Sequence, residues 1–314
     1  MYLKFSKKGI EISLRLRIRS FYIIKMDIWH KLGRIFRISN LGTVIFFALN
    51  IVLIYGVFGS SAESIYLIVI YFITIAISLS PIGEWFLCVV AGAEDIKRID
   101  IKIHVIPLVE VVLDAAKEKS LYSVERVNVK IIRDQTPNAF ALGKHTIALT
   151  EGLLQLPDDV VMAVIAHEIG HLAYGHTVIQ LLIGGGNVFI SGFLFLIKVV
   201  YWSFTVIMGL FSIASRSGIM GIFTALFAGV SYGLTWIWVK FCKLFLMWSM
   251  RQNELVADEF AAKIGFGYEL AFALDNQLCD VPHNGFLNAL YDSHPCNDDR
   301  IAALQELGVG YSRY

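Results

Sequence analysis

Residues 160–173 read VVMAVIAHEIGHLA, an apolar run that carries three polar side chains at its centre. The run follows the sequence PDD at 157–159, a typical helix start, and a helix that is apolar on nearly every side is buried. His167, Glu168 and His171 must therefore be buried with it. Because burying such groups without partners costs several kcal/mol, the fold has to supply a partner for each of them.

The spacing of the two histidines indicates a metal ion as their shared partner. His167 and His171 are four residues apart, so both imidazoles lie on one helix face and can reach one cation. Glu168 is rotated by about 100° from His167 and can face a water molecule without binding the ion itself. This H-E-x-x-H pattern is typical of zinc peptidases. We therefore predict one Zn²⁺ per chain, with Glu168 as the catalytic base. The alternative is a chance match with two core histidines bonded to the backbone.

The third ligand is expected from a distant segment. His176 lies five residues after His171, well off the shared helix face, and is predicted to be a residue at the helix end. The segment NELVAD at 253–258 is a better candidate, because Glu254 and Asp258 share one helical face. One carboxylate could bind zinc while the other orients a ligand histidine through its second ring nitrogen. An acidic patch on a solvated helix is the competing interpretation.

The composition indicates a membrane protein. Of the 314 residues, 56% are hydrophobic and only 17% are charged, with a mean hydropathy of +0.64. One soluble domain cannot bury such an apolar excess. Residues 38–62 and 64–83 contain no charge, and each run is long enough to cross about 30 Å of hydrocarbon as a helix. Two further spans are predicted near 188–212 and 219–242, an even number that returns the chain to the side of the histidines.

The distribution of charge predicts the orientation in the membrane. Residues 1–40 contain ten Lys or Arg against two acidic residues, and they run directly into the first apolar stretch. A basic segment beside a first span is the usual signal for the cytoplasmic side, and this interpretation is favoured over a nucleic-acid-binding arm. We therefore expect an integral, multi-pass protein of the inner (plasma) membrane with a cytoplasmic catalytic domain and no nucleic-acid partner. The four cysteines form no CxxC pair, so no disulfide framework is expected.

These features predict a mainly α membrane protein with about four transmembrane helices and an α+β catalytic domain that carries a small antiparallel sheet. A helix is expected at about 103–119, with Pro107 in its first turn, and strands at 124–132, 139–142 and 146–149. The predicted organisation is a basic N-terminal segment (1–37), a transmembrane hairpin (38–83), the first part of the catalytic domain (84–177), a membrane-inserted segment (178–249) and the second part of the catalytic domain (250–314).

Several motifs in this order resemble the HtpX-like membrane zinc metallopeptidases, which are relatives of the CAAX prenyl proteases. The resemblance covers about residues 100–314 and implies a gluzincin-like zinc peptidase domain. The matching motifs are HEIGH at 167–171, ELVAD at 254–258, PNAFALG at 137–143, and SHP at 293–295 with Arg300.

The resemblance implies a role for each matching residue. By that likeness Glu254 is the third zinc ligand, and Asp258 orients a ligand histidine through the ring nitrogen that does not bind zinc. His294 would stabilise the tetrahedral oxyanion, and Arg300 would hold the site together. Backbone groups of the PNAFALG strand would pair with an extended peptide substrate. The substrate-binding residues implied in this strand are Asn138, Ala139, Phe140 and Ala141.

The expected function is an endopeptidase that hydrolyses membrane or misfolded proteins at the cytoplasmic face, with peptide or protein substrates and the lipid bilayer as partners. A role in protein quality control rests on the resemblance alone. The alternatives are a dedicated processing protease of the prenyl-protease type and a catalytically silent membrane scaffold that retains zinc. Glu168 argues against the scaffold, because structural zinc needs no base. A transporter is disfavoured because Asn50 is one of few polar residues within the spans.

Overall fold

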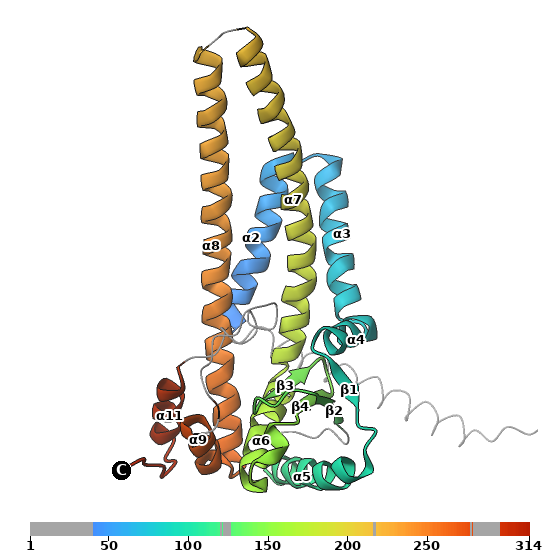
Figure 1. The fold of residues 1–314 in the computed structure, drawn as a ribbon, viewed down its shortest axis with the longest axis vertical. Coiled ribbons are helices and arrows are strands. Elements are labelled where there is room, and N and C mark those ends of the chain that lie inside the picture. The colour runs from blue at the N-terminus through green and yellow to red at the C-terminus, as the bar shows by residue number, and fades with distance from the viewer. Residues whose placement is uncertain (1–39, 120, 122–126, 216–217, 277, 279–295) are drawn as a thin grey trace, which may run out of the picture. The chain divides into compact units, whose positions relative to one another are not determined.

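The protein is described by a computed structural model that covers residues 40–119, 121, 127–215, 218–276, 278 and 296–314 (Figure 1). The described residues all belong to one compact unit, Ser39–Tyr314. This unit consists mostly of helices, together with one four-stranded sheet. The expectation of a mainly α protein with a small sheet is confirmed, whereas the basic segment 1–37 lies outside the described residues.

The first two apolar helices form a hairpin. α2 spans Leu41–Phe58 and α3 spans Ala62–Ser78. Inside the hairpin Asn50 Nδ2 donates a hydrogen bond to the Tyr71 hydroxyl at 3.1 Å, and both side chains are fully buried. The outer faces of both helices carry many exposed apolar side chains, as expected of helices that contact lipid.

The second apolar helix ends earlier than the sequence predicts. The uncharged run predicts a helix that continues to residue 83, whereas α3 ends at Ser78 and α4 (Pro81–Val90) follows after a bend of 68°. A proline cannot donate the backbone hydrogen bond that would continue α3, but its fixed φ suits the first turn of a new helix. Ser80 caps this new helix by accepting a hydrogen bond from the Ile82 N–H at 3.2 Å. The chain therefore turns sharply where it leaves the hairpin.

Two long helices connect the two parts of the predicted catalytic domain. α7 spans His176–Ala214 and α8 spans Gly218–Lys263, and Figure 1 shows them as an antiparallel pair that extends beyond the α2–α3 turn. α7 packs closely on α3, because a Cβ on Gly185 would lie 2.4 Å from Ser78 Oγ. Among the described residues, α2 and α7 are long and apolar enough to cross a membrane. The bent pair α3–α4 counts as a third candidate span if its two helices are taken together as one span. This finding does not confirm the predicted count of four.

The sheet has the strand order β1-β2-β4-β3. β2 and β4 are parallel, whereas the other two pairs are antiparallel, so the prediction of an antiparallel sheet is wrong. All five residues of β4 are buried, so this strand needs a neighbour on each side. The short turn at residues 143–145 joins β3 to β4 and places β3 antiparallel on one side of β4. The second neighbour is β2, which lies on the other side of β4. β2 is separated from β4 in sequence by the oppositely directed β3 and therefore runs parallel to β4. The strands are β1 (Ala93–Asp95), β2 (Asn128–Ile132), β3 (Ala139–Leu142) and β4 (Thr146–Thr150).

Helix α6 (Asp158–Tyr174) lies at the centre of the predicted catalytic domain. Its residues from 160 to 173 are nearly all buried, so the prediction of a buried helix is confirmed. The helix packs against the sheet, α5, α8 and α9. The contact with α8 is close, because a Cβ on Gly170 would lie 3.1 Å from the Ala257 Cα. Glycine at this position thus lets the H-E-x-x-H helix approach the segment at 254–258.

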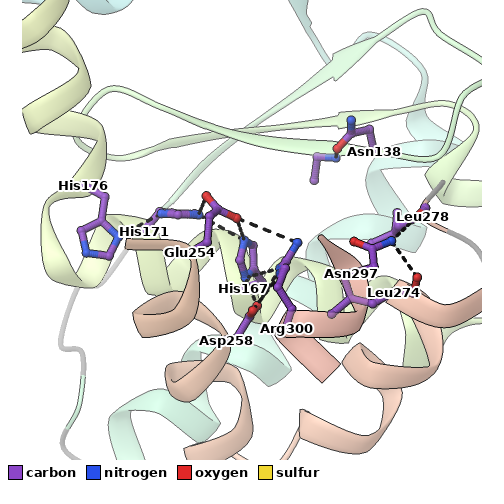
Figure 2. A network of polar contacts seen from close by, with 11 residues as sticks. Asn138, His167, His171, His176, Glu254, Asp258, Leu274, Leu278, Asn297 and Arg300 are labelled. Atoms are coloured by element: carbon purple, nitrogen blue, oxygen red, sulfur yellow. Dashed lines mark hydrogen bonds and ion pairs between the residues drawn. The ribbon is translucent and has the colours of Figure 1, made fainter. Parts of the chain in front are cut away.

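Three further helices and a short 3₁₀ helix lie in the described residues of the predicted catalytic domain. α5 begins before the predicted helix start at 103, so Pro107 lies inside the helix and not in its first turn. Apolar side chains of α5 that pack into the core hold the helix despite the lost hydrogen bond. Asn297 Nδ2 donates to the carbonyls of Leu274 (2.8 Å) and Leu278 (2.7 Å), which fixes the start of α11 to the end of α9 (Figure 2). The bounds are α5 (Ile99–Glu118), η2 (Leu153–Gln155), α9 (Gly267–Asn276) and α11 (Asn297–Glu306).

The close packing of α2 on α8 predicts that Gly42→Ala destabilises the protein. A Cβ at this position would lie 2.2 Å from the Phe245 carbonyl oxygen, so one of the two helices must shift. We expect a loss of about 1–3 kcal/mol, measured as a lower midpoint of thermal unfolding in detergent. The matched control is Gly56→Ala on the same helix, where a Cβ meets nothing within 4 Å. Because alanine favours helix formation, this control should keep or raise the midpoint, and equal midpoints for both variants would contradict the packing.

Candidate metal centre

Three donor groups from two helices converge where α6 packs on α8 (Figure 2). His171 Nε2 lies 3.1 Å from His167 Nε2 and 3.2 Å from Glu254 Oε1. His167 Nε2 lies 3.4 Å from Glu254 Oε2. All three side chains are buried, and their donor atoms lie within 4.8 Å of one another, close enough to hold one metal ion. The structure therefore brings together side chains of α6 and α8 that are separated in sequence by α7 and most of α8.

The spacing of these donors fits a tetrahedral zinc ion. Zinc bonds of about 2.0–2.2 Å to nitrogen and oxygen, arranged as a tetrahedron, place neighbouring donors roughly 3.3–3.5 Å apart. The observed separations of 3.1, 3.2 and 3.4 Å are close to this range. Two imidazoles and a carboxylate are also a donor set that suits Zn²⁺, and three protein ligands leave a fourth position for water, as in catalytic sites.

A buried ion pair of Asp258 and Arg300 contacts His167 at Nδ1, the ring nitrogen that faces away from the other donors. Its Nδ1 lies 2.7 Å from Asp258 Oδ1, and Asp258 accepts two hydrogen bonds from Arg300, from Nε at 2.8 Å and from Nη2 at 2.6 Å. Burial raises the pKa of Asp258, but the charges and hydrogen bonds of Arg300 and His167 together outweigh burial and lower the pKa to about 2. Burial lowers the pKa of His167, but the charge and hydrogen bond of Asp258, together with a hydrogen bond to Glu254, raise it to about 10. The ionised carboxylate accepts the Nδ1 hydrogen of His167, so Nε2 of this ring faces the other donors.

The second histidine of the motif is held in a similar way by a side chain that sequence reasoning missed. His176 Nδ1 lies 3.0 Å from His171 Nδ1, and His176 is only 2% exposed. The helix-face argument keeps His176 out of the donor set and at a helix end, but it does not foresee this contact, because α6 ends at Tyr174 and a left-handed φ of 73° at Gly175 turns the chain into α7. When His171 Nε2 binds a metal ion, the hydrogen of the neutral ring is on Nδ1, which can then donate it to His176 Nδ1. A glycine directly before a histidine is the sequence signal that could have indicated this turn.

Glu168 connects α6 to the edge of the sheet. Its side chain is buried, and its Oε2 accepts a hydrogen bond from the Ala141 backbone N–H at 2.6 Å. β3, which contains Ala141, is an edge strand in the described part of the chain, because it pairs only with β4. The Ala141 N–H is thus donated to Glu168 and is not offered to a further strand in this structure. A peptide along this edge would lie beside Glu168.

The other residues of the predicted substrate strand lie on or directly before β3. The Asn138 side-chain oxygen accepts a hydrogen bond from the Ala139 N–H at 2.8 Å, directly before the strand (Figure 2). Ala139 and Ala141 belong to the core around α6, whereas Phe140 packs on the opposite face of the sheet, towards α4. His294 lies outside the described residues, so the structure places no side chain for the predicted oxyanion role.

Comparison with known proteins agrees with this geometry. The sequence profile of Peptidase family M48 matches residues 107–308, which include both helices of the site. The chain belongs to peptidase family M48. It is 31% identical over 217 residues to Protease HtpX of Hahella chejuensis, covering 61% of this chain and 70% of that protein. It is 30% identical over 221 residues to Protease HtpX of a Psychrobacter species, covering 63% of this chain and 70% of that protein. A Protease HtpX homolog of Desulfotalea psychrophila is 29% identical over 213 residues, covering 61% and 71%.

The resemblance to HtpX-like peptidases is therefore confirmed. As a member of family M48 with apolar helices able to span a membrane, the protein is a membrane metallopeptidase, a hydrolase of peptide bonds. The family suggests a metal cofactor, and the cluster of His167, His171 and Glu254 is a possible place for it among the described residues. This agreement between family and geometry makes the cluster the candidate active site.

The contact between the two histidines predicts that His176→Ala weakens metal binding. Loss of the hydrogen-bond acceptor frees the His171 ring to rotate, so we expect a rise of about 10- to 100-fold in the dissociation constant for zinc, measured by competition with a chelator. The matched control is Thr177→Val, the next residue on α7, which is equally buried but whose hydroxyl has no hydrogen-bond partner among the described residues. Equal affinities for His176→Ala and the unmodified protein would show that His176 does not position His171.

Proposed function

We propose that the chain is a zinc-dependent endopeptidase whose single zinc ion is held by His167, His171 and Glu254. The observation that carries the proposal is the convergence of these three buried donors at a spacing that suits a tetrahedral ion. When bound, zinc supplies a Lewis acid that polarises the scissile carbonyl and lowers the pKa of a water molecule. The remaining chemistry falls to side chains of the protein.

Glu168 is the proposed general base. It takes a proton from the attacking water and passes it to the leaving amine, the usual task of a positioned carboxylate. Its place directly after His167 on α6 supports this role, because adjacent helical positions differ by about 100° and Glu168 can lie near the site without being a ligand. The hydrogen bond from the Ala141 N–H at 2.6 Å holds one of its oxygens, which reduces the freedom of the carboxylate to turn away.

The outer edge of β3 is the proposed place for the substrate. An extended peptide can add to an exposed sheet edge through main-chain hydrogen bonds, which gives broad tolerance of sequence. Asn138, Ala139, Phe140 and Ala141 form this edge and the residue before it. The contact between Ala141 and Glu168 supports the assignment, because a scissile bond aligned with β3 would lie beside the base.

Two further residues are proposed to support the reaction in different ways. Arg300 is a positioning residue that acts on His167 through Asp258, as its two hydrogen bonds to that carboxylate suggest. His294 would stabilise the tetrahedral oxyanion, a role that rests on the family's late H-P…R element. An oxyanion donor of this kind contributes substantially to peptide hydrolysis because it binds charge that develops only in the transition state.

We further propose four membrane crossings with both parts of the catalytic domain in the cytoplasm. The α2–α3 hairpin would supply two crossings, and the α7–α8 pair would supply the other two, within the segments 38–83 and 178–249. An even number of crossings is required for Glu254 to share a site with the histidines of α6. The excess of Lys and Arg before the first span supports the cytoplasmic side.

The proposed substrates are membrane or misfolded proteins, in the manner of quality-control peptidases. A dedicated processing protease of the prenyl-protease type is the alternative enzyme, and a zinc-retaining scaffold is the alternative from another class. The buried Glu168 beside the donor set favours an enzyme, because a structural metal site needs no base.

A substitution of the base tests the proposal. We expect Glu168→Gln to retain zinc. In detergent it should hydrolyse a denatured protein about 10²- to 10⁴-fold more slowly than the unmodified protein, because general-base catalysis is lost. Metal content by mass spectrometry and cleavage on gels measure the two properties separately. The matched control is Glu110→Gln on the exposed face of α5. Zinc binding without cleavage by the unmodified protein would favour the scaffold, and cleavage by Glu168→Gln at the unmodified rate would exclude Glu168 as the base.

Labelling of cysteines tests the sidedness. Cys296 is exposed in the catalytic part, so in a variant that keeps only this cysteine we expect a membrane-impermeant maleimide to react after cell disruption and not in intact spheroplasts. Ser215→Cys, at the exposed turn between α7 and α8, should show the opposite pattern, with labelling in intact spheroplasts. Labelling of Cys296 in intact spheroplasts would contradict a cytoplasmic catalytic domain.

A further inference from the structure

Helix α4 exposes its apolar face. Ile82, Trp85, Phe86 and Val89 follow the helical spacing i, i+3, i+4 and i+7, and each is 53–64% exposed. An amphipathic helix on a water-soluble domain turns such a stripe towards the core and its charged residues towards solvent. α4 does the opposite, because Glu84 is on its inner side. The stripe formed by these four apolar residues therefore points away from the core of the described residues.

The inner side of α4 is fixed to the sheet. Glu84 Oε1 accepts a hydrogen bond from Thr146 Oγ1 at 2.5 Å, and its Oε2 accepts one from the Lys144 N–H at 3.2 Å. Gly143 lies against the same carboxylate, since a Cβ there would approach it to 2.4 Å. Cys88 packs with apolar residues of β3 and β4 on this face of the sheet. The position of α4 therefore determines the position of the turn that joins β3 to β4.

α4 also begins where a membrane helix ends. Only two residues separate α3 from α4, and the axes of the two helices are bent by 68°. Ile73 and Ile77 in the last part of α3 are exposed, as side chains that face lipid are, and the apolar surface continues along the chain into the stripe of α4. Because membrane helices tilt on average about 20° from the bilayer normal, a bend of 68° brings α4 towards the membrane plane.

We propose that α4 is an interfacial helix whose apolar stripe binds the lipid bilayer at the level of the headgroups. Helices of this kind lie in the plane of the membrane and bury their apolar face about 5–10 Å into the boundary between headgroups and acyl chains. Tryptophan is enriched at this depth, because its ring is amphipathic, and Trp85 lies in the middle of the stripe.

The placement of α4 sets the height of the peptidase site above the membrane. Glu84 holds the turn that follows β3, and Ala141 in β3 contacts Glu168, so the edge strand and the base are tied to the bilayer surface. Resting on the proposed function, the favoured substrate is a polypeptide segment that directly follows a membrane-inserted stretch. Such a segment leaves the bilayer beside β3 and reaches this edge without unfolding of a distant domain.

Site-directed spin labelling tests the placement. Trp85→Cys, in full-length protein that lacks the native cysteines, is labelled with a nitroxide and reconstituted in nanodiscs of phosphatidylcholine and phosphatidylglycerol. The accessibility of the label to oxygen, which concentrates in the bilayer, is compared with its accessibility to a water-soluble nickel chelate. Ile70→Cys on α3 is the reference for lipid, and Glu118→Cys on α5 is the reference for water, because both positions are exposed. We expect the oxygen-to-nickel ratio at position 85 to exceed that at 118 several-fold and to stay below that at 70.

Three results would overturn the placement. A ratio at position 85 equal to that at 118 places α4 in water, and a ratio equal to that at 70 makes α4 part of a membrane span. Protection from both reagents shows that a second copy or another protein covers the stripe. Val89→Cys, one turn further along the same stripe, provides the same measurement if Trp85→Cys does not fold.

A substrate comparison tests the consequence. We expect W85S/F86S to cleave a reporter whose scissile segment directly follows a transmembrane helix several-fold more slowly in proteoliposomes, with unchanged hydrolysis of a soluble peptide. The matched control is I99S/I103S, which removes two exposed apolar side chains from α5 and should change neither rate. Equal loss with both substrates, or no loss with either, would overturn the inferred substrate preference. If the unmodified protein cleaves neither substrate, the proposed function fails while the spin-label result on α4 still stands.

Discussion

The approach of α8 to α6 is the contact on which the rest of the site depends. Gly170 has no side chain, so Ala257 of α8 can come within 3.1 Å of the position that a Cβ would take. At this distance Glu254 and Asp258, one helical turn apart on α8, both reach the histidines of α6. A helix as apolar as α6 can bury ionisable groups only if other groups pair with them. The C-terminal part of α8 supplies these partners, although α7 and most of α8 separate it from α6 in sequence.

The sequence predicts the features that depend on local geometry, and it misses those that depend on how elements meet. The buried helix, the shared face of its histidines and a distant carboxylate partner follow from helical spacing and from the cost of burial. The contact of His176 could not be derived in this way, because the left-handed turn at Gly175 removes the residues after it from the face of α6. The parallel pairing of β2 with β4 was missed because β4 lies beside β2 in the sheet, although β3 separates the two strands in sequence. The end of α3 at Ser78, by contrast, could have been read from Pro81.

Buried polar contacts join the membrane helices to the metal centre. Thr43 Oγ1 donates to Ser249 Oγ at 3.1 Å, and Asn253 Nδ2 donates to Asn40 Oδ1 at 3.2 Å, which links the start of α2 to the turn of α8 directly before Glu254. Buried polar pairs are costly to separate and therefore fix the register of the helices that carry them. The carboxylate of the site is thus positioned against the first membrane helix, and the peptidase part is built as a continuation of the helix bundle.

X-ray absorption at the zinc K-edge of the metal-loaded protein tests the central claim most directly, because it reports the atoms bound to the ion. The account predicts four nitrogen or oxygen neighbours at about 2.0–2.2 Å, with the outer scattering of two imidazole rings and the loss of one oxygen neighbour or a longer bond in Glu254→Gln. Sulfur neighbours at about 2.3 Å, an imidazole count other than two, or a spectrum unchanged by Glu254→Gln would contradict it.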